Sequence, residues 1–371
     1  MTRSEVAIVG GGLAGLYAAR LLHKAGVNFI LLEARDRLGG RILSVNASGR
    51  SSEDGFDLGP SWYWPQMQPA MGALVEELGL PTFNQNSDGD VVFERMSRET
   101  PQRYRGTGAD QQSIRLVGGT AALVRALALE LPSEKLLLGM RVTAMTLVSG
   151  GVELTISRAN GATRKYVAQR AIAALPPRLL EATVVFTPGQ EAATAQLWRE
   201  TATWMAPHAK FFALYDRPFW RDSDLSGTAQ SMVGPMVEMH DATTASGSAA
   251  LFGFLGVGAE QRAALGEEEL TRACLAQLAR IFGSEASVPR ATLLKDWASD
   301  PLTATAADRG SGGHLVPGGA VWVSRPWQER LALAGSETSP SEPGYLAGAV
   351  EAAKRAAAEI LSKLQVNDQH G

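Results

Sequence analysis

The sequence is poor in several features, and each shortage excludes a class of protein. Its 371 residues include one cysteine, Cys274, so no disulfide can form within the chain and nothing requires an oxidising compartment. The chain has 35 Lys and Arg against 38 Asp and Glu, which leaves no basic surplus of the kind that binds nucleic acid. No apolar run reaches the roughly 18 residues that span a bilayer. We therefore expect a cytoplasmic protein that contacts neither membrane nor nucleic acid.

Glycine, in contrast, is plentiful, and its first cluster predicts a nucleotide-binding unit. The apolar run 6–9 is typical of a buried strand, and it leads directly into the sequence GGGLAG at 10–15. This cluster matches G-x-G-x-x-G. Gly10 allows the tight turn, Gly12 lets backbone approach a pyrophosphate, and Gly15 lets a helix pack closely on the strand.

A helix, a second strand and an acidic residue complete this unit. The helix is predicted over 13–24, and its first residues, Leu13 and Ala14, would direct backbone N–H groups at phosphate. The strand predicted over 27–32 ends at Glu33, near the ~20-residue offset at which a carboxylate binds a ribose hydroxyl. Because an acidic residue stands there instead of an arginine, the 2′-phosphate of NADP is disfavoured.

The residues after Glu33 distinguish a flavin from a nicotinamide cofactor. The run 34–41 reads ARDRLGGR, which places three arginines and a second glycine turn beside the phosphate site, where a plain dinucleotide dehydrogenase needs neither. This stretch resembles the GxGxxG…EARxRxGGR signature of the flavin amine oxidase superfamily, which includes monoamine, polyamine and L-amino acid oxidases and histone demethylases. The alternative for the arginines is an ordinary solvated surface. The resemblance implies FAD as the cofactor, with contacts from Ala34, Arg35, Gly40 and Arg41.

Later motifs extend the resemblance to the end of the chain. The segment 57–61, DLGPS, resembles the family stretch that runs beneath the flavin ring and ribityl chain. AGSET at 334–338 and GYLAGA at 344–349 resemble the turn and terminal helix that close the family's cofactor site. Val142 matches the family position that holds the adenine, and Trp297 matches the tryptophan that packs by the flavin. The FAD contacts thus implied are Leu58, Gly59, Pro60, Ser61, Val142, Trp297, Gly335, Glu337, Gly344 and Leu346.

Lys210 is the candidate catalytic lysine. The segment 205–220 resembles the family strand in which a lysine hydrogen-bonds through a water to flavin N5. The apolar residues 211–214 indicate a buried strand, where an isolated ammonium is costly and needs a partner. The alternatives are that Lys210 points into solvent or that Lys295 takes this role. His208 would share the face of Lys210 in an extended chain, and we interpret it as structural.

Tyr345 and two tryptophans are candidates for the substrate cavity. Tyr345 matches one tyrosine of the aromatic cage of monoamine oxidases, which is positioned to hold the amine. The cysteine that attaches FAD in those enzymes, and the second cage tyrosine after it, correspond to Ala306 and Ala307. The resemblance therefore implies non-covalent FAD and an incomplete cage. Trp62 and Trp64 would either line the cavity or fill the core.

The predicted fold is a two-domain α/β protein, with a Rossmann-like FAD-binding domain and a reduced α+β substrate domain. The FAD-binding domain is expected from 1–80, 105–199 and 300–371, and the substrate domain from 81–104 and 200–299. The stretch that caps the pocket in larger family members is short here, so the resemblance implies nothing about the shape of the cavity.

Strands and one long helix are expected to make up the substrate domain. Residues 231–240 and 249–256 are predicted to be strands with polar turns between them. Residues 265–282 have the periodicity of an amphipathic helix that ends at Gly283 and carries Cys274.

The activity that the resemblance implies is FAD-dependent oxidation of an amine. A neutral amine would pass a hydride from its α-carbon to flavin N5, the imine would hydrolyse, and O2 would reoxidise the flavin to give H2O2. Two alternatives stay open: a dehydrogenase or desaturase of a non-amine substrate on the same scaffold, and a flavin-holding protein without turnover. The histidines show no metal-ligand spacing, and the sequence indicates no oligomeric state.

Overall fold

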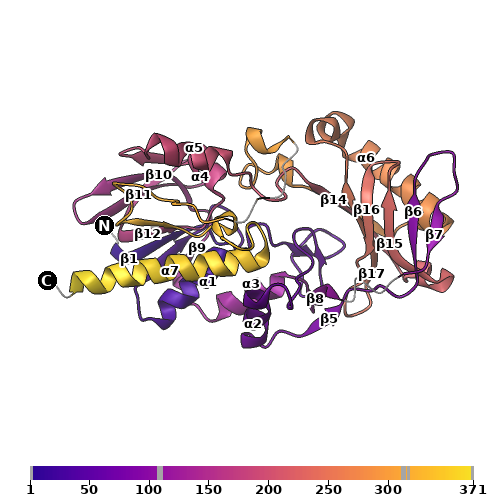
Figure 1. The fold of residues 1–371 in the computed structure, drawn as a ribbon, viewed down its shortest axis with the longest axis horizontal. Coiled ribbons are helices and arrows are strands. Elements are labelled where there is room, and N and C mark those ends of the chain that lie inside the picture. The colour runs from indigo at the N-terminus through magenta and orange to yellow at the C-terminus, as the bar shows by residue number, and fades with distance from the viewer. Residues whose placement is uncertain (1–2, 107–111, 311–314, 316–317, 369–371) are drawn as a thin grey trace.

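The computed structural model describes residues 3–106, 112–310, 315 and 318–368. Two β-sheets lie side by side along the long axis of the molecule, each with its own helical cover (Figure 1). We call the part built on the eight-stranded sheet the first lobe and the part built on the seven-stranded sheet the second lobe. Both ends of the described chain lie in the first lobe.

The sheet of the first lobe brings together the beginning, middle and end of the chain. Its order is β13-β10-β11-β12-β1-β2-β9, with β19 also paired to β12. The central strand β12 runs parallel to β1 and β19, and it forms an antiparallel meander with β11 and β10. The strands are β1 (Arg3–Val9), β2 (Phe29–Leu32), β9 (Leu136–Leu137), β10 (Arg141–Val148), β11 (Gly151–Ser157), β12 (Thr163–Ala173), β13 (Val185–Thr187) and β19 (Leu331–Leu333).

Helices cover both faces of this sheet because its central strands are apolar on both sides. Val6 and Ile8 of β1 belong to the core beneath α1 and α7, whereas Ala7 and Val9 belong to the core beneath α4 and α5. The long helix α7 lies along α1 (Figure 1). The helices are α1 (Leu13–Lys24), α2 (Pro69–Glu77), α3 (Ala121–Leu129), α4 (Pro177–Thr183), α5 (Ala192–Glu200) and α7 (Leu346–Asp368). The helix predicted over 13–24 is therefore confirmed.

The second lobe is a mixed sheet with one long helix on its outer face. The strand order is β18-β14-β17-β16-β15-β6-β7. Helix α6 (Ala259–Phe282) packs on one face and buries Cys274 there, while the other face contacts the small sheet of β3 (Ser44–Val45) and β4 (Phe56–Asp57). The strands are β6 (Asp90–Glu94), β7 (Gln102–Tyr104), β14 (Ala209–Tyr215), β15 (Leu225–Ser231), β16 (Met236–Asp241), β17 (Ala249–Leu255) and β18 (Ala291–Asp296).

Two predictions for this lobe need correction. The single strand expected over 231–240 is wrong, because the chain turns at Gly234, whose φ of 102° is in the left-handed region, and forms β15 and β16 on either side. The predicted helix 265–282 starts earlier, at Ala259, and kinks at Gly266. In both cases a glycine with positive φ marks the departure.

Two small sheets and several 3-10 helices complete the structure. Two small sheets pair β3 (Ser44–Val45) with β4 (Phe56–Asp57) and β5 (Thr82–Asn84) with β8 (Ile114–Leu116). The 3-10 helices are η2 (Ser133–Lys135), η3 (Phe219–Ser223), η4 (Ser284–Ser287), η5 (Trp297–Ser299), η6 (Ala306–Asp308) and η7 (Ser336–Thr338). The chain passes from α5 of the first lobe to β14 of the second through residues 201–208, which we call the crossing segment. The predicted domain boundaries stay a prediction.

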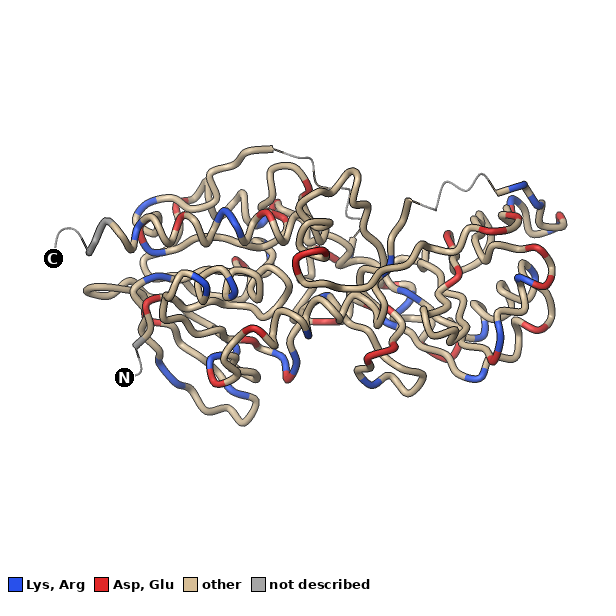
Figure 2. The backbone as a smooth tube through the Cα atoms, turned by 90° about the horizontal axis from the view of Figure 1, so that it is seen from below, with Lys and Arg blue, Asp and Glu red and all other residues tan. Residues whose placement is uncertain are grey.

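Neither sign of charge dominates along the chain (Figure 2). Acidic and basic positions are interspersed along both lobes (Figure 2). Among the described helices, none combines the length and apolar content needed to cross a membrane.

Candidate active site

The two glycine turns of the first lobe touch each other, and at several of their glycines a side chain would not fit. Gly10 has a φ of 105°, and a Cβ added to it would lie 2.7 Å from the Ala174 carbonyl oxygen. A Cβ at Gly15 would lie 1.9 Å from the carbonyl oxygen of Gly10, which fixes how closely α1 packs on β1. The N–H of Gly39, in the second turn, donates to the carbonyl of Gly11 at 2.8 Å.

Glu33 and the start of α1 make this end of the site suitable for a nucleotide. The buried Glu33 carboxylate accepts the N–H of Gly11 at 2.6 Å through Oε2 and the N–H of Arg35 at 2.8 Å through Oε1. No side chain caps the N-terminus of α1, and a Cβ at Gly12 would have no neighbour closer than 3.9 Å. The first N–H groups of the helix are therefore open to an anion, which the helix dipole also favours.

The three arginines that follow Glu33 are engaged inside the protein, which rules out the solvated-surface alternative. Arg35 forms a bidentate pair with Asp300 at 2.9 and 3.0 Å. Arg37 donates to the carbonyl of Gly40 at 2.9 Å, and burial together with Arg35 lowers its pKa. Arg41 contacts Glu337 at 2.6 Å. Arg37 thus holds the second glycine turn itself, whereas Arg35 and Arg41 tie this loop to distant parts of the chain.

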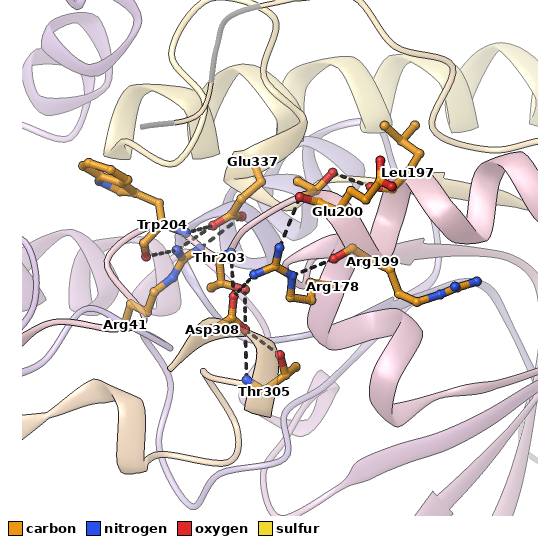
Figure 3. A network of polar contacts seen from close by, with 11 residues as sticks. Arg41, Arg178, Leu197, Arg199, Glu200, Thr203, Trp204, Thr305, Asp308 and Glu337 are labelled. Carbon is orange, nitrogen blue, oxygen red and sulfur yellow. Dashed lines mark hydrogen bonds and ion pairs between the residues drawn. The ribbon is translucent and has the colours of Figure 1, made fainter. Parts of the chain in front are cut away.

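Arg41 and Glu337 fix the crossing segment to the first lobe (Figure 3). The Glu337 side chain is fully buried, and its Oε1 accepts both Arg41 and the Trp204 N–H, the latter at 3.2 Å. Arg41 also donates to the Trp204 carbonyl at 3.0 Å. Glu337 does not line the cavity described below, so the structure places this predicted FAD contact behind the wall, where it acts through Arg41 and Trp204.

A second clamp holds the same segment one residue earlier. Asp308 of η6 accepts Arg178 at 2.6 Å and the backbone N–H of Thr203 at 3.1 Å (Figure 3). Its other oxygen accepts the N–H of Thr305 at 2.9 Å, which caps η6. Arg178 adds hydrogen bonds to the carbonyls of Arg199 and Glu200 at the end of α5. The crossing segment is therefore fixed by residues from three distant parts of the chain.

One cavity of about 390 Å³ joins the glycine turns to the second lobe. It runs from Glu33 and Arg35 past Leu58 and Gly59 to Lys210 and Tyr345. All the residues predicted for the site line this cavity except Gly15 and Glu337. Gly15 lies behind the turn, where its contribution is the close packing of α1 on Gly10.

The far end of the cavity is walled by aromatic rings, which we call the aromatic chamber: Trp62, Trp64, Trp204, Phe254 and Tyr345. The Tyr345 ring lies 6.3 Å from Trp64, nearly perpendicular to it, and 5.9 Å from Trp204. Burial, followed by the nearby Glu342 carboxylate, raises the pKa of Tyr345, so its hydroxyl stays protonated at neutral pH. Trp62 and Trp64 both line the cavity, and their role toward a substrate stays a prediction.

Trp204 is a chamber residue that sequence reasoning missed. Ala306 and Ala307, the positions matched to the attachment cysteine and second cage tyrosine, lie on η6, where they are exposed and outside the cavity. Trp204 comes from the irregular crossing segment, and its backbone is placed by Arg41 and Glu337. The segment has no periodicity that would have indicated this position. Trp204 thus adds an aromatic ring beside Tyr345 from a different part of the chain.

Lys210 lies on β14 with its ammonium turned toward the first lobe. The side chain is 4% exposed, which excludes the solvent-facing alternative. Nζ donates to the Gly59 carbonyl at 2.6 Å and to Ser61 Oγ at 2.9 Å, and it lies 4.6 Å from the centre of the Phe252 ring. Burial lowers the pKa of Lys210 to about 7, although the nearby Asp57 carboxylate opposes this. Lys210 thus holds the loop that the resemblance places beneath the flavin.

The side chain of Lys295, the alternative candidate, does not line the cavity. It pairs with Lys210 across β14 and β18, yet its Nζ lies 3.1 Å from Asp300 and 4.4 Å from the centre of the Trp297 ring. Trp297 itself donates from Nε1 to the Leu58 carbonyl at 3.0 Å and lines the cavity. Lys295 is absent from the cavity wall, so Lys210 is the lysine that faces the site.

His208 lines the cavity beside Trp204, with 6.4 Å between the ring centres. Its Nδ1 is buried and has no partner among the described residues. Burial, followed by the Arg262 guanidinium, lowers the pKa of His208, so the ring is neutral near pH 7. The side chain therefore contributes polarity without charge to the approach to the aromatic chamber.

The sequence matches a family of known proteins over most of its length. Residues 13–106 and 92–361 match the family model "Flavin containing amine oxidoreductase". A probable flavin-containing monoamine oxidase A of Dictyostelium discoideum is 25% identical over 98% of each chain. Amine oxidase [flavin-containing] B of Homo sapiens is 26% identical over 97% of this chain and 86% of its own. These alignments run over 466 and 465 positions, so the relatives contain segments that the 371-residue chain lacks.

Solved structures with the same fold belong to similar proteins. A structure of putrescine oxidase matches with a TM-score of 0.79 at 22% identity, and it covers 97% of this chain and 99% of its own. Cyclohexylamine oxidase from Brevibacterium oxydans IH-35A matches with a TM-score of 0.79 at 20% identity, covering 98% and 99%. The two-lobe fold is thus shared over nearly the whole chain.

Proposed function

Because the chain belongs to the flavin-containing amine oxidoreductase family, we propose that it oxidises small amines with FAD as cofactor and O2 as electron acceptor. The observation that carries the proposal is a single cavity that joins the bare glycine turn to a chamber of aromatic rings and a buried lysine. The FAD is non-covalent, since the one cysteine of the chain is buried in the core of the second lobe.

The first lobe offers groups suited to each part of FAD. Glu33, at the end of β2, would bind the adenosine ribose, and the uncapped N-terminus of α1 would receive the pyrophosphate. The loop 58–61, held by Lys210, would support the flavin ring, and residues 344–346 lie on the same cavity wall. When bound, FAD supplies an acceptor for the hydride from the amine α-carbon and passes the electrons to O2, giving H2O2.

The residues of the chamber would orient the amine and shield it from water. Tyr345 packs against both Trp64 and Trp204, so a substrate chain entering the chamber would meet apolar rings. Such walls bind a neutral amine through apolar contact, and water that later enters would hydrolyse the imine. The Lys210 ammonium, whose pKa is about 7, would place a positive charge beside the loop 58–61. That charge favours the negative charge that develops as O2 is reduced.

The test is an anaerobic titration of the purified, FAD-loaded protein with primary amines, polyamines and amino acids, followed by admission of air. We expect one class of amine to bleach the visible flavin band, and air to restore it with release of peroxide. Bound flavin that no amine bleaches, but that a non-amine C–C substrate does, would overturn the proposal in favour of a dehydrogenase or desaturase. Bleaching by amines without recovery in air would overturn only the choice of O2 as acceptor.

A further inference from the structure

His208 is the last residue of the crossing segment and directly precedes β14. The N–H of Trp297 donates to the His208 carbonyl at 3.1 Å, so the pairing of β14 with β18 continues by one residue. In an extended chain, side chains two positions apart share a face about 7 Å from each other, and both His208 and Lys210 line the cavity. The His208 ring thus lies between Trp297 and Trp204, which is 6.4 Å away in the aromatic chamber.

The two nitrogens of the His208 ring differ in their access to the cavity. Nδ1 is buried and has no partner among the described residues, whereas Nε2 is not enclosed in this way. Because the ring lines the cavity, Nε2 is the nitrogen that a molecule there can reach. Arg262 of α6 holds the preceding residue, since it donates to the Pro207 carbonyl at 2.8 Å and pairs with Asp296 at 2.7 Å. The backbone is therefore fixed on both sides of the ring.

The His208 ring is neutral near pH 7 and can take up a proton. Burial, followed by the positive charge of Arg262, lowers the pKa of His208, and contact with the Met205 backbone opposes this only in part. In the tautomer that carries its hydrogen on Nδ1, Nε2 has a lone pair that can accept one. A water molecule in the cavity can therefore donate to Nε2.

The other titratable side chains on the described cavity wall are unsuited to this role. Both oxygens of Glu33 accept backbone N–H groups at the nucleotide end. Lys210 Nζ donates to two backbone carbonyls, at 2.6 and 3.3 Å, and to the Ser61 hydroxyl at 2.9 Å, which uses all three protons of an ammonium. Tyr345 keeps its proton because its pKa is raised, and the arginines of the wall have no acceptor. His208 is thus the base that remains near the chamber.

The proposed reaction needs such a base after the hydride has left the amine. The product has a carbon–nitrogen double bond, and water attacks its carbon slowly unless another group takes the proton of the water. The water oxygen bonds to the carbon, the π electrons move to nitrogen, and one water proton moves to Nε2 of His208. The imidazolium then returns that proton to the nitrogen, the carbon–nitrogen bond breaks, and the hydroxyl proton leaves with the departing amine or ammonia.

We propose that His208 is the general base that adds water to the imine inside the cavity, so that the enzyme releases the carbonyl product instead of the imine. The inference rests on the proposed function and adds the residue that completes the reaction. It gives His208 a catalytic role in place of the structural one that the sequence indicated.

The first test supplies a preformed imine and needs no flavin turnover. N-benzylidenemethylamine is mixed with the FAD-loaded full-length protein, and the benzaldehyde that forms is followed by its absorbance. We expect the wild-type protein to accelerate the hydrolysis and the rate of His208→Gln to be about a hundredfold lower, as for loss of a general base. A wild-type protein without acceleration, or a variant that matches it, overturns the inference.

His240→Gln is the matched control, because His240 is a second buried histidine that packs on the chamber from outside. Its ring lies 4.8 Å from that of Trp62, yet it does not line the cavity. This variant should hydrolyse the imine at the wild-type rate. Equal loss in both variants would show that packing around the chamber, and no base at position 208, accelerates the hydrolysis.

Chemical rescue separates proton transfer from packing at His208 itself. In His208→Gly, added imidazole can occupy the space of the missing ring, so it should restore part of the imine hydrolysis while leaving the wild-type rate unchanged. A loss of hydrolysis that imidazole does not restore would assign the ring a packing role and overturn the inference.

The last test follows the imine during turnover with the amine that bleaches the flavin. Cyanide in the reaction converts released imine into an aminonitrile, which is counted per amine oxidised. His208→Gln should give several times more aminonitrile than the wild type, because more imine leaves before water adds to it. Equal amounts would overturn the inference alone. If no amine bleaches the flavin, the proposed function fails, while the preformed imine still decides whether His208 acts as a base.

Discussion

The two ends of the cavity differ in the groups that form their walls. At the nucleotide end the wall is largely backbone, with glycines that exclude side chains and arginines that are already paired with carboxylates or carbonyls. At the aromatic end the wall is made of side chains that come from separate segments of both lobes. The cofactor end therefore depends on backbone geometry and should tolerate little change. The substrate end depends on individual side chains, so each substitution there should change substrate binding by the contact that it removes.

The largest effect is expected from a methyl group at the nucleotide end. In Gly15→Ala the new Cβ would lie 1.9 Å from the Gly10 carbonyl oxygen, so α1 must move away from β1. We expect FAD content to fall close to zero and the free energy of unfolding to fall by about 3 kcal/mol. Flavin absorbance per protein and urea denaturation measure the two quantities.

Gly26→Ala serves as the matched control, because Gly26 has a φ of 73° and no atom within 4 Å of the added Cβ. Its cost should be about 1 kcal/mol of backbone strain, with FAD still bound. Equal FAD loss in both variants would mean that the nucleotide end is no more constrained than an ordinary turn.

Lys210 on the second lobe bonds to Gly59 and Ser61 of the first, and its loss should have the next largest effect. Lys210→Met removes the positive charge beside the loop 58–61, so reoxidation of the reduced flavin by O2 should slow about a hundredfold. Stopped-flow mixing of the reduced protein with aerated buffer measures this rate. Lys295→Met, on the neighbouring strand and outside the cavity, should reoxidise at the wild-type rate.

Comparison of the wild type with Lys210→Met also reports the free-energy cost of burying the Lys210 ammonium. Its pKa is about 7 in the folded protein against an ordinary value of 10.5. Between these values the unfolded chain holds a proton that the folded chain lacks, so wild-type stability relative to Lys210→Met should rise as the pH rises from about 7 to about 10.5. Below pH 7 the difference should be constant. A flat difference across the whole range would show that Lys210 is not desolvated in solution.

The smallest effect is expected from one wall of the aromatic chamber. Trp204→Ala removes a ring 5.9 Å from Tyr345 and leaves the backbone contacts of residue 204 with Arg41 and Glu337 available. The KM of the preferred amine should rise about threefold, as for loss of one aromatic contact, with FAD content unchanged. Trp204→Phe should restore most of the binding. Loss of FAD from Trp204→Ala would instead assign this ring to the cofactor end.

The contrast between the two ends also explains what the sequence could predict. Gly10, Gly12 and Glu33 could be placed because local spacing alone determines a strand, a turn and a helix. The position of Trp204 could not, because it depends on Arg41 and Glu337, which are far from it in sequence.

The orientation of the Glu337 side chain could not be predicted from the sequence either. Its motif was recognised, yet whether a carboxylate faces the cavity or the residues behind it depends on tertiary packing.

The central strand of the first lobe has a consequence for how the chain folds during synthesis. β12 is flanked by β1 from the beginning of the chain and β19 from near its end, and the clamps on the crossing segment need Asp308 and Glu337. The second lobe is therefore synthesised before Asp308 and Glu337 have left the ribosome. Until then, residues 201–208 lack the hydrogen bonds that fix them to the first lobe. The lobe that contains the N-terminus is thus the last to be completed.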